Sequence, residues 1–374
     1  MNALRQSTVV RHLALTAVAA AALLALTYGL APFRNYQLAT VAAYLCATAG
    51  LTVLTGLSGQ LSLGHGALMA TGAYPVALAQ NAFRDREISE GWVLPVSLAI
   101  GVATALVAGL VVGLAAARLR GPYLAGVTLA VAVIVPAITT AFDGVFNGDQ
   151  GLSIFVEPPP LALGATFPYE RWQAWLALTG ALLTMFLLAN LVRSRYGRQF
   201  RAVRDDEVAA RLAGINVART QVLAFVVSAA CAGLGGGLLA VLAQSVSPGA
   251  FSLTLSLFLV MAVVIGGLGR LAGAVWGAVL LVLLPEATHS LTEALSLSPA
   301  AAQRLDGNLP LAIFGSTLVA VMLLAPGGVQ GLLARAGGRI RAGRWGGGRR
   351  GAGPADRPPE QRRPVTQPPA DHAV

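Results

Sequence analysis

The sequence predicts an all-α membrane protein, a polytopic helical bundle with about ten transmembrane helices. The first observation is composition: 56% of the 374 residues are hydrophobic and 11% are charged, whereas a soluble domain carries roughly 25% charged residues. The second is that apolar runs of about 20 residues recur, which is the length needed to cross the hydrocarbon core. The third is that these runs are continuous, which favours helices over the alternating pattern of a membrane β-barrel.

Ten spans are predicted, with ends placed to within about 2–4 residues: 12–31, 38–57, 61–80, 92–117, 122–142, 172–192, 220–243, 251–268, 271–290 and 309–326. The first also fits the apolar region of a signal peptide, because Arg5 and Arg11 precede it. It is long for such a region and ends in a poor cleavage site, so we predict a retained span. At this point 61–80 can either cross the membrane or re-enter from one side.

The distribution of arginines predicts the orientation of the chain. All 26 residues that are Lys or Arg are Arg. With a cytoplasmic N-terminus and ten crossings, 21 arginines lie inside and five lie outside, and cytoplasmic loops normally carry this excess. The outside loops also collect acidic residues: Asp85, Glu87, Glu90, Asp143, Asp149, Glu157, Glu170, Glu293 and Asp306. We therefore predict that both termini are cytoplasmic.

Composition divides the chain into two parts. Residues 1–333 form the predicted transmembrane domain, and its longest polar loop is 193–219. Residues 334–374 are rich in Arg, Gly and Pro, which is typical of a disordered tail. The net charge of +10 raises the possibility of a nucleic-acid partner. Aromatic residues are not interleaved with the arginines, however, so we expect contact with anionic membrane lipid and no nucleic acid.

A polar, glycine-rich segment runs from Gly56 to Ala67 between two apolar runs. Its side chains Gln60, Ser62 and His65 are costly in lipid unless they are hydrogen-bonded. Such a segment is tolerated where it packs against protein or lines a wet cavity, and polar residues there often mark a substrate path. We predict that these three residues lie at a gate or a helix break. The alternative is a tight cytoplasmic turn in which Gln60 and Ser62 cap the next helix and His65 is structural.

The loop 193–219 is the longest polar stretch before the tail, and the arginine distribution places it in the cytoplasm. Asp205 and Asp206 suit the start of a helix, and Gly214 suits its end. Apolar residues recur between them at i, i+4 and i+7 and predict one apolar stripe: Val208, Leu212 and Ile215. A short helix of this kind docks a soluble partner or lies on the membrane surface.

Other residues are predicted to serve packing. Three pairs of glycines, each four residues apart within apolar segments, allow close approach of helices: Gly109 and Gly113, Gly233 and Gly237, Gly273 and Gly277. The two cysteines, Cys46 and Cys231, also lie in apolar segments and are predicted to be small packing residues.

The sequence lacks the residues needed for ATP hydrolysis, metal binding and nucleophilic catalysis. Without lysine there is no Walker-type Gly-x-x-x-x-Gly-Lys-Ser/Thr motif, so any ATP hydrolysis must come from another chain. No second His or Cys stands at metal-ligand spacing from His65, and no nucleophile–base constellation is evident. We expect no enzyme activity, no metal and no cofactor. Glu286 is the carboxylate that comes closest to lying within a span, which argues against proton coupling.

Several motifs occur in the order and at the spacing of a known family. Within residues 35–333, the chain resembles the LivM-type permeases of branched-chain amino-acid ABC importers. The residues that carry the resemblance are 57–65 with 72–74, 119–124 with 127–130, 204–216, 223–228 with 232–234, 247–248, 266–269, Gly277 and 326–328.

The resemblance implies three kinds of protein partner: a second permease subunit of the LivH type, two cytoplasmic ABC ATPase subunits, and an extracytoplasmic solute-binding protein. It also implies that Asp205 to Asn216 is the coupling helix that docks into an ATPase. The implied docking residues are Arg204, Asp205, Asp206, Glu207, Ala209, Ala210, Arg211 and Gly214. The chain departs from the family where relatives usually carry Thr-Gly-Gly-x-Asn-Gly-Leu, because here Val145 to Leu152 differ.

The expected function is that of a permease domain over residues 1–333 in a bacterial cytoplasmic membrane. It would translocate branched-chain amino acids or similar small polar solutes, driven by ATP hydrolysis in separate subunits. The alternatives are a self-sufficient secondary transporter or channel for a small solute, an ABC permease for urea or amides, and a scaffold subunit without a pathway.

Overall fold

The computed structural model describes residues 8–84, 90–119, 122–155, 158–160, 163–164, 166–294, 299–324 and 327–335. Within these ranges the chain is almost entirely helical, and its two strands are two residues long each. The predicted all-α polytopic fold is confirmed. The predicted disordered tail over 334–374 lies outside the described residues, apart from its first two positions.

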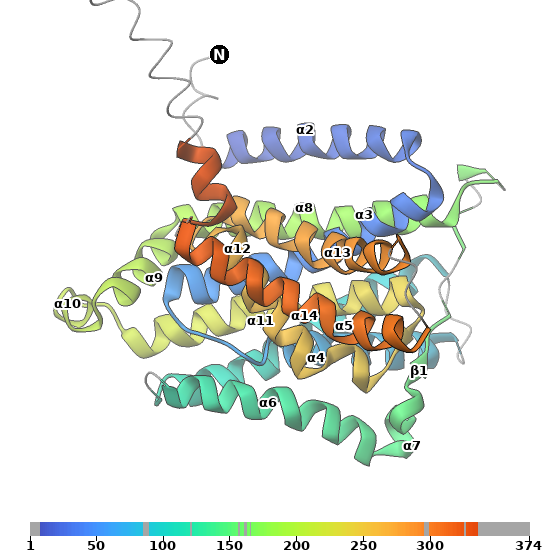
Figure 1. Cartoon of the computed structure of the whole chain (residues 1–374). Helices are drawn as coiled ribbons and strands as arrows, with labels where there is room; N and C mark the ends of the chain where they lie inside the picture. The colour runs from blue at the N-terminus through green and yellow to red at the C-terminus, as the bar shows by residue number, and fades with distance from the viewer. Residues whose placement is uncertain are drawn as a thin grey trace, which may run out of the picture. The chain divides into compact units, whose positions relative to one another are not determined.

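Long helices make up most of the described chain (Figure 1). The elements in chain order are α2 (Thr8–Gly29), α3 (Pro32–Leu51), η1 (Thr52–Leu57), α4 (His65–Arg84), α5 (Glu90–Ala116), α6 (Pro122–Ala141), α7 (Asp143–Phe146), η2 (Gly148–Gln150), β1 (Leu152–Ser153), α8 (Tyr169–Arg193), α9 (Arg195–Asp205), α10 (Glu207–Leu212), α11 (Val217–Ala243), β2 (Ser245–Val246), η4 (Pro248–Phe251), α12 (Leu253–Gly267), α13 (Leu271–Ala294) and α14 (Pro299–Leu324).

Within the described residues, eight helices are long and apolar enough to cross a membrane, and they correspond to eight of the ten predicted spans. They are α2, α3 with η1, α5, α6, α8, α11, η4 with α12, and the end of α14 with the residues after it. A ninth predicted span, 271–290, lies in α13, whose apolar part Leu271–Ala287 is shorter. The tenth, 61–80, becomes helical only at His65.

Helix α4 is not among the eight long apolar helices, and other helices of the bundle surround it. It packs between α5 and α11, and most of its residues up to Gln80 are buried. A Cβ atom at Gly72 would collide with the backbone of Gly233 in α11. A helix enclosed in this way can carry Gly and polar residues, since its neighbours replace the lipid that would penalise them.

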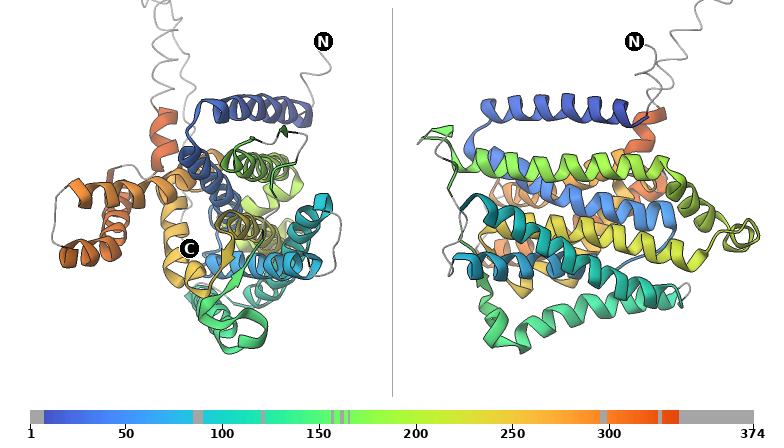
Figure 2. Two further views of the ribbon diagram at one scale, coloured as in Figure 1. Left: turned by 90° about the vertical axis from the view of Figure 1, so that its right-hand side faces the viewer. Right: turned by 180° about the vertical axis from the view of Figure 1, so that it is seen from behind.

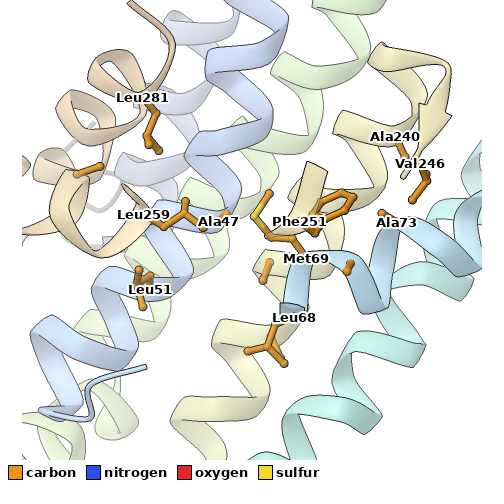
Figure 3. Packing of buried hydrophobic residues seen from close by; sticks show 14 of the residues in the cluster. Ala47, Leu51, Leu68, Met69, Ala73, Ala240, Val246, Phe251, Leu259 and Leu281 are labelled. Carbon is orange, nitrogen blue, oxygen red and sulfur yellow. The ribbon is translucent and has the colours of Figure 1, made fainter. Parts of the chain in front are cut away.

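Helix α11 lies at the centre of the bundle and packs against α3, α4 and α5. Figure 2, seen from behind, shows α3 between α8 and α11, and α3 contacts both of them. The predicted small-residue packing is confirmed: Gly109 of α5 abuts Ala229 of α11, and Gly273 of α13 abuts Gly266 of α12. Figure 3 shows the adjoining apolar core, where Met69 and Phe251 lie in one cluster.

The two strands close the end of the bundle opposite α9 and α10 (Figure 1). Leu152 pairs with Val246 in an antiparallel register. Gly151, at a φ of 72°, lies so close to Val246 that no side chain would fit there. The segment from Val145 to Leu152, which departs from the family pattern, therefore packs against the connection between α11 and α12. At this same end Arg34 of α3 pairs with Glu286 of α13 at 3.5 Å.

Candidate functional site

The first candidate region is a break in the helical path between α3 and α4, which we call the helix break. We define it as residues 56–65, from the last turn of η1 to the first residue of α4. Helix α3 widens into the π-helix η1, which ends at Leu57. Gly59 then adopts a φ of 74°, a conformation that glycine reaches without steric cost. The chain stays non-helical from Gly59 to Gly64, and α4 begins at His65.

The helix break carries the chain back into the interior of the bundle. The His65 ring nitrogen Nε2 lies 3.1 Å from the carbonyl oxygen of Ala47. Ala47 precedes Leu57 by ten residues along α3 and η1, which is roughly 15 Å of helix. Helix α4 therefore begins well inside the bundle. The alternative of a tight cytoplasmic turn is wrong, whereas the contact of His65 with Ala47 agrees with the alternative of a structural histidine.

Side chains from two distant helices satisfy the backbone around the helix break. The Leu63 N–H donates to Thr128 Oγ1 of α6 at 3.0 Å. The Gly66 N–H donates to Ser256 Oγ of α12, also at 3.0 Å. These bonds meet the requirement that buried backbone groups find partners. They also fix the position of the helix break relative to α6 and α12.

The polar side chains of the helix break are buried without complete partners. Gln60 is 5% exposed, and Ser62 and His65 are 0% exposed. The Gln60 Nε2 group donates to Ser58 Oγ, but Gln60 Oε1, Ser62 Oγ and His65 Nδ1 have no hydrogen-bond partner. Gln60 and Ser62 therefore do not cap α4. Because His65 Nε2 must donate to the Ala47 carbonyl, Nδ1 of the neutral ring is an unused acceptor.

The second candidate region is the polar loop 193–219. Ser194 caps the start of α9, where its side chain accepts from the Tyr196 N–H. Asp206 caps the start of α10, where its Oδ1 accepts from the Val208 and Ala209 N–H groups at 2.8 and 3.0 Å. The predicted Asp cap is confirmed for Asp206. Gly214, at a φ of 81°, ends the turn after α10 as predicted.

The exposed tip of the loop carries two large apolar side chains among polar ones. Val208 is 64% exposed and Leu212 is 86% exposed, on a helix of six residues. The predicted extension of this stripe to Ile215 is wrong, because α10 ends at Leu212 and the chain then turns back. Ile215 instead packs with Val203 of α9. Two large apolar side chains thus remain uncovered at the tip.

The predicted docking residues occupy different environments. Asp205, Asp206, Ala209, Arg211 and Gly214 are exposed. Ala210 is buried at 3% exposure, in the small cluster that joins α9 to α10.

Five of the predicted docking residues form side-chain hydrogen bonds within the chain: Arg204, Asp205, Asp206, Glu207 and Arg211. Glu207 Oε1 accepts from Gln221 Nε2 of α11 at 3.1 Å, and Glu207 Oε2 pairs with Arg211 at 3.4 Å. Arg204 donates from Nη1 to the carbonyl oxygen of Gly56 at 2.8 Å. The structure therefore joins the two candidate regions through Arg204.

Sequence reasoning does not find the side chains that bond the candidate regions to the rest of the bundle. Thr128 and Ser256 lie within predicted spans, and Gln221 lies near the start of another. Thr128 bonds a residue 65 positions earlier in the chain, and Ser256 bonds one 190 positions earlier. The one local signal for them is that each is a polar side chain within an apolar helix, the kind of residue that bonds across helices in membranes.

Among the residues that the structure describes, no group of three or more His, Cys, Asp or Glu side chains is placed to hold a metal ion. Cys46 and Cys231 are free thiols buried in the bundle. Cys46 lies 3.6 Å from Thr184 Oγ1 of α8, whose hydroxyl donates to the sulfur. These positions agree with the predicted packing role of the cysteines.

A family profile and the most similar relatives point to the same protein family. The profile described as "Branched-chain amino acid transport system / permease component" matches residues 35–325. The chain is 32% identical to the high-affinity branched-chain amino acid transport system permease protein LivM of Escherichia coli, over 67% of this chain and 62% of that protein. It therefore spans somewhat less than two thirds of the length of that relative.

More distant relatives fall in the same group. The chain is 26% identical to the LivH permease protein of Escherichia coli, over 77% of this chain and 91% of that protein. It is 30% identical to the autoinducer 2 import system permease protein LsrC of an Enterobacter strain, over 50% of this chain and 52% of that protein. No solved structure matches the chain. Since one profile covers most of its length, the chain belongs to the family of permease components of branched-chain amino acid transport systems.

Proposed function

We propose that this multi-pass membrane protein is the permease subunit of an importer driven by ATP hydrolysis in separate subunits. Its substrates would be branched-chain amino acids or similar small polar solutes, and it would catalyse no chemical reaction itself. The observation that carries the proposal is the exposed apolar tip of α10, at the end of a polar loop. Val208 and Leu212 are 64% and 86% exposed there, as expected of side chains that a soluble partner covers.

The partner at this tip is a cytoplasmic ATPase, and α10 is the coupling helix that docks into it. Docking would bury Val208 and Leu212, while Asp205, Asp206 and Arg211 would meet the polar rim of the partner surface. Two such ATPases, a second permease subunit of the LivH type and an extracytoplasmic binding protein would complete the transporter. The similarity of the chain to both LivM and LivH proteins supports a pair of related permease subunits.

The orientation follows from the arginines of the loop. Residues 193–219 contain seven arginines, and such clusters stay on the cytoplasmic side. We therefore place α9, α10 and both termini in the cytoplasm, and the paired strands β1 and β2 outside. The membrane is then the cytoplasmic membrane of a bacterium.

The helix break is the proposed gate of the pathway. Gln60 Oε1, Ser62 Oγ and His65 Nδ1 are buried without partners, and such groups cost free energy in a closed state. An opened state that admits water or a polar solute would supply the missing hydrogen bonds. The helix break would then be buried in one state of the transport cycle and hydrated in the other, as the pathway opens to each side of the membrane in turn.

The test is reconstitution of the chain in lipid vesicles with its partner permease. We expect uptake of a radiolabelled branched-chain amino acid only when the ATPases, ATP and the binding protein are all present. Uptake under an ion gradient without the ATPases would overturn the proposal and favour a secondary transporter or channel. Competition by unlabelled leucine, urea and amides in the same vesicles identifies the class of solute.

A further inference from the structure

Arg204 is the last arginine of α9 and reaches across to the start of the helix break. Its Nη1 donates to the Gly56 carbonyl oxygen at 2.8 Å. Its Nε and Nη2 bond the Asp205 carboxylate at 2.9 and 2.8 Å. Gly56 lies in the last turn of η1, where backbone carbonyls lack an N–H partner within the helix. Arg204 therefore supplies a donor to this carbonyl, and the Asp205 carboxylate orients the guanidinium.

Gly59 makes room for the stem of the Arg204 side chain, and Gly56 and Gly269 pack closely beside its guanidinium. A Cβ atom at Gly59 would lie 2.8 Å from Arg204 Cγ. A Cβ atom at Gly269, in the turn between α12 and α13, would lie 3.6 Å from Arg204 Nη1. A Cβ atom at Gly56 would collide with the Gly269 backbone. The Arg204 stem thus lies against the first residue of the non-helical stretch, and its guanidinium lies where η1 meets the α12–α13 turn.

Arg204 connects α10 to the helix break. Along the chain, Asp206 follows two residues later and caps α10 through the Val208 and Ala209 N–H groups. In space, the Arg204 stem lies against Gly59, which directly precedes Gln60. The described residues from 194 to 216 form several side-chain hydrogen bonds. Of these, the bond from Arg204 to Gly56 is the one made with η1 or the helix break.

We propose that Arg204 is a positioning residue that transmits movement of α10 to the helix break, which rests on the proposed function of the chain. In the state described here, its bond to Gly56 holds the break with Gln60, Ser62 and His65 buried. The Arg204 side chain is 38% exposed, so water can replace the carbonyl when the bond opens. Displacement of α10 by the ATPase moves Arg204 away from Gly56 and frees the break.

A merely structural role is the competing explanation, and Arg201 provides the matched control. Arg201 lies in the same helix and also donates to a backbone carbonyl, that of Val192 at 3.4 Å. R201Q and R204Q each remove one charge and one such bond, but R201Q leaves the connection to Gly56 intact. Both variants are compared with the unmodified chain in the full transporter complex, in vesicles of the same lipid.

The first measurement is the number of solute molecules imported per ATP hydrolysed. We expect uptake per ATP to fall about tenfold in R204Q. Weaker docking of the ATPase would lower uptake and ATP hydrolysis together and leave this ratio unchanged. R201Q keeps the original ratio, and R204K, which retains a donor but not the fork geometry, falls between them. An unchanged ratio in R204Q, or an equal loss in R201Q, overturns the proposal. Failure of both R204Q and R204K to assemble also overturns it, because the role is then structural.

The second measurement reports the helix break directly. Cys46 and Cys231 are replaced by alanine, and Ser62→Cys supplies one thiol at a position that is 0% exposed. A small thiol reagent should label this cysteine faster when a non-hydrolysable ATP analogue is added. In R204Q the labelling rate should no longer depend on the analogue. A nucleotide response that persists in R204Q overturns the transmission role.

The two proposals fail in different ways. If the unmodified complex imports no solute with ATP, the proposed function is wrong. If it does import solute and R204Q keeps the same uptake per ATP, the function stands and the role of Arg204 is wrong.

Discussion

The helix break and the tip of α10 depart from the usual distribution of polar and apolar groups in opposite directions. In the helix break, the polar atoms Gln60 Oε1, Ser62 Oγ and His65 Nδ1 are buried without partners. At the tip, Val208 and Leu212 are exposed. Each arrangement is unfavourable in the isolated chain, because unpaired polar groups and uncovered apolar groups both cost free energy.

The comparison indicates what each region lacks. The helix break lacks hydrogen-bond donors and acceptors, which water or a polar solute supplies. The tip lacks an apolar surface, which a protein partner supplies. The backbone in both regions is nevertheless well held: Thr128 and Ser256 bond the helix break, and Asp206 caps α10. The unsatisfied groups are therefore side chains on backbone that hydrogen bonds hold in place, as a binding or gating site requires.

The largest expected effect comes from filling space at the helix break. A Cβ atom at Gly64 would collide with the Thr128 carbonyl, so Gly64→Val must displace α6 or the break. Overpacking of this kind costs about 1–3 kcal/mol, and here it also moves the proposed gate. We expect uptake to fall by about 100-fold or more, with thermal stability lowered. Gly126→Val is the control, because a Cβ atom there meets nothing within 4 Å. Equal uptake by the two variants would contradict the prediction.

The second effect concerns the tip. Leu212→Asp places a charge where an apolar side chain is 86% exposed, so folding should be almost unaffected. Burial of a leucine contributes about 1.5–3 kcal/mol, and its loss should weaken ATPase binding by about 10- to 100-fold. Affinity is measured by titrating detergent-purified permease with the ATPase. Ser245→Asp, at the opposite end of the bundle, adds the same charge and should leave affinity unchanged. Unaltered binding by Leu212→Asp would remove α10 from the interface.

The third prediction contrasts an unpaired with a paired hydroxyl. Ser62 Oγ has no partner, so Ser62→Ala should not lower thermal stability. Thr128 Oγ1 accepts from the Leu63 N–H and donates to the Ala125 carbonyl, so Thr128→Val should lower stability by about 1–3 kcal/mol. Denaturation curves of the two variants measure the difference. If Ser62 belongs to the gate, Ser62→Ala should still reduce uptake. A larger stability loss for Ser62→Ala than for Thr128→Val would show that the hydroxyl is structural.

The smallest effect is expected at Glu207. Its carboxylate pairs with Arg211 at 3.4 Å and accepts from Gln221, with its side chain 35% exposed. Glu207→Gln keeps an acceptor for Gln221, and a partly exposed ion pair contributes only about 0–1 kcal/mol. Uptake and ATPase affinity should stay within about twofold of the original. A loss as large as that of Leu212→Asp would instead make the Glu207 charge a direct ATPase contact.

Much of the fold could be predicted because its signals are local. Continuous apolar runs specify the spans, and eight of the ten predicted segments correspond to helices long enough to cross a membrane. The cap at Asp206 and the turn at Gly214 were also predictable, because a cap bonds N–H groups two and three residues away. The stripe to Ile215 failed because the period of the pattern does not show where a six-residue helix ends.

The sequence by itself determined that this protein is a helical membrane bundle, that its polar residues collect at 56–67 and 193–219, and which family it resembles. Only the tertiary structure decided that the first region turns back into the bundle, with His65 bonded to Ala47. It also decided that Arg204 meets Gly56, 148 positions away. Helix and cap signals arise from neighbours along the chain, whereas these contacts depend on how separate helices pack, which local patterns do not encode.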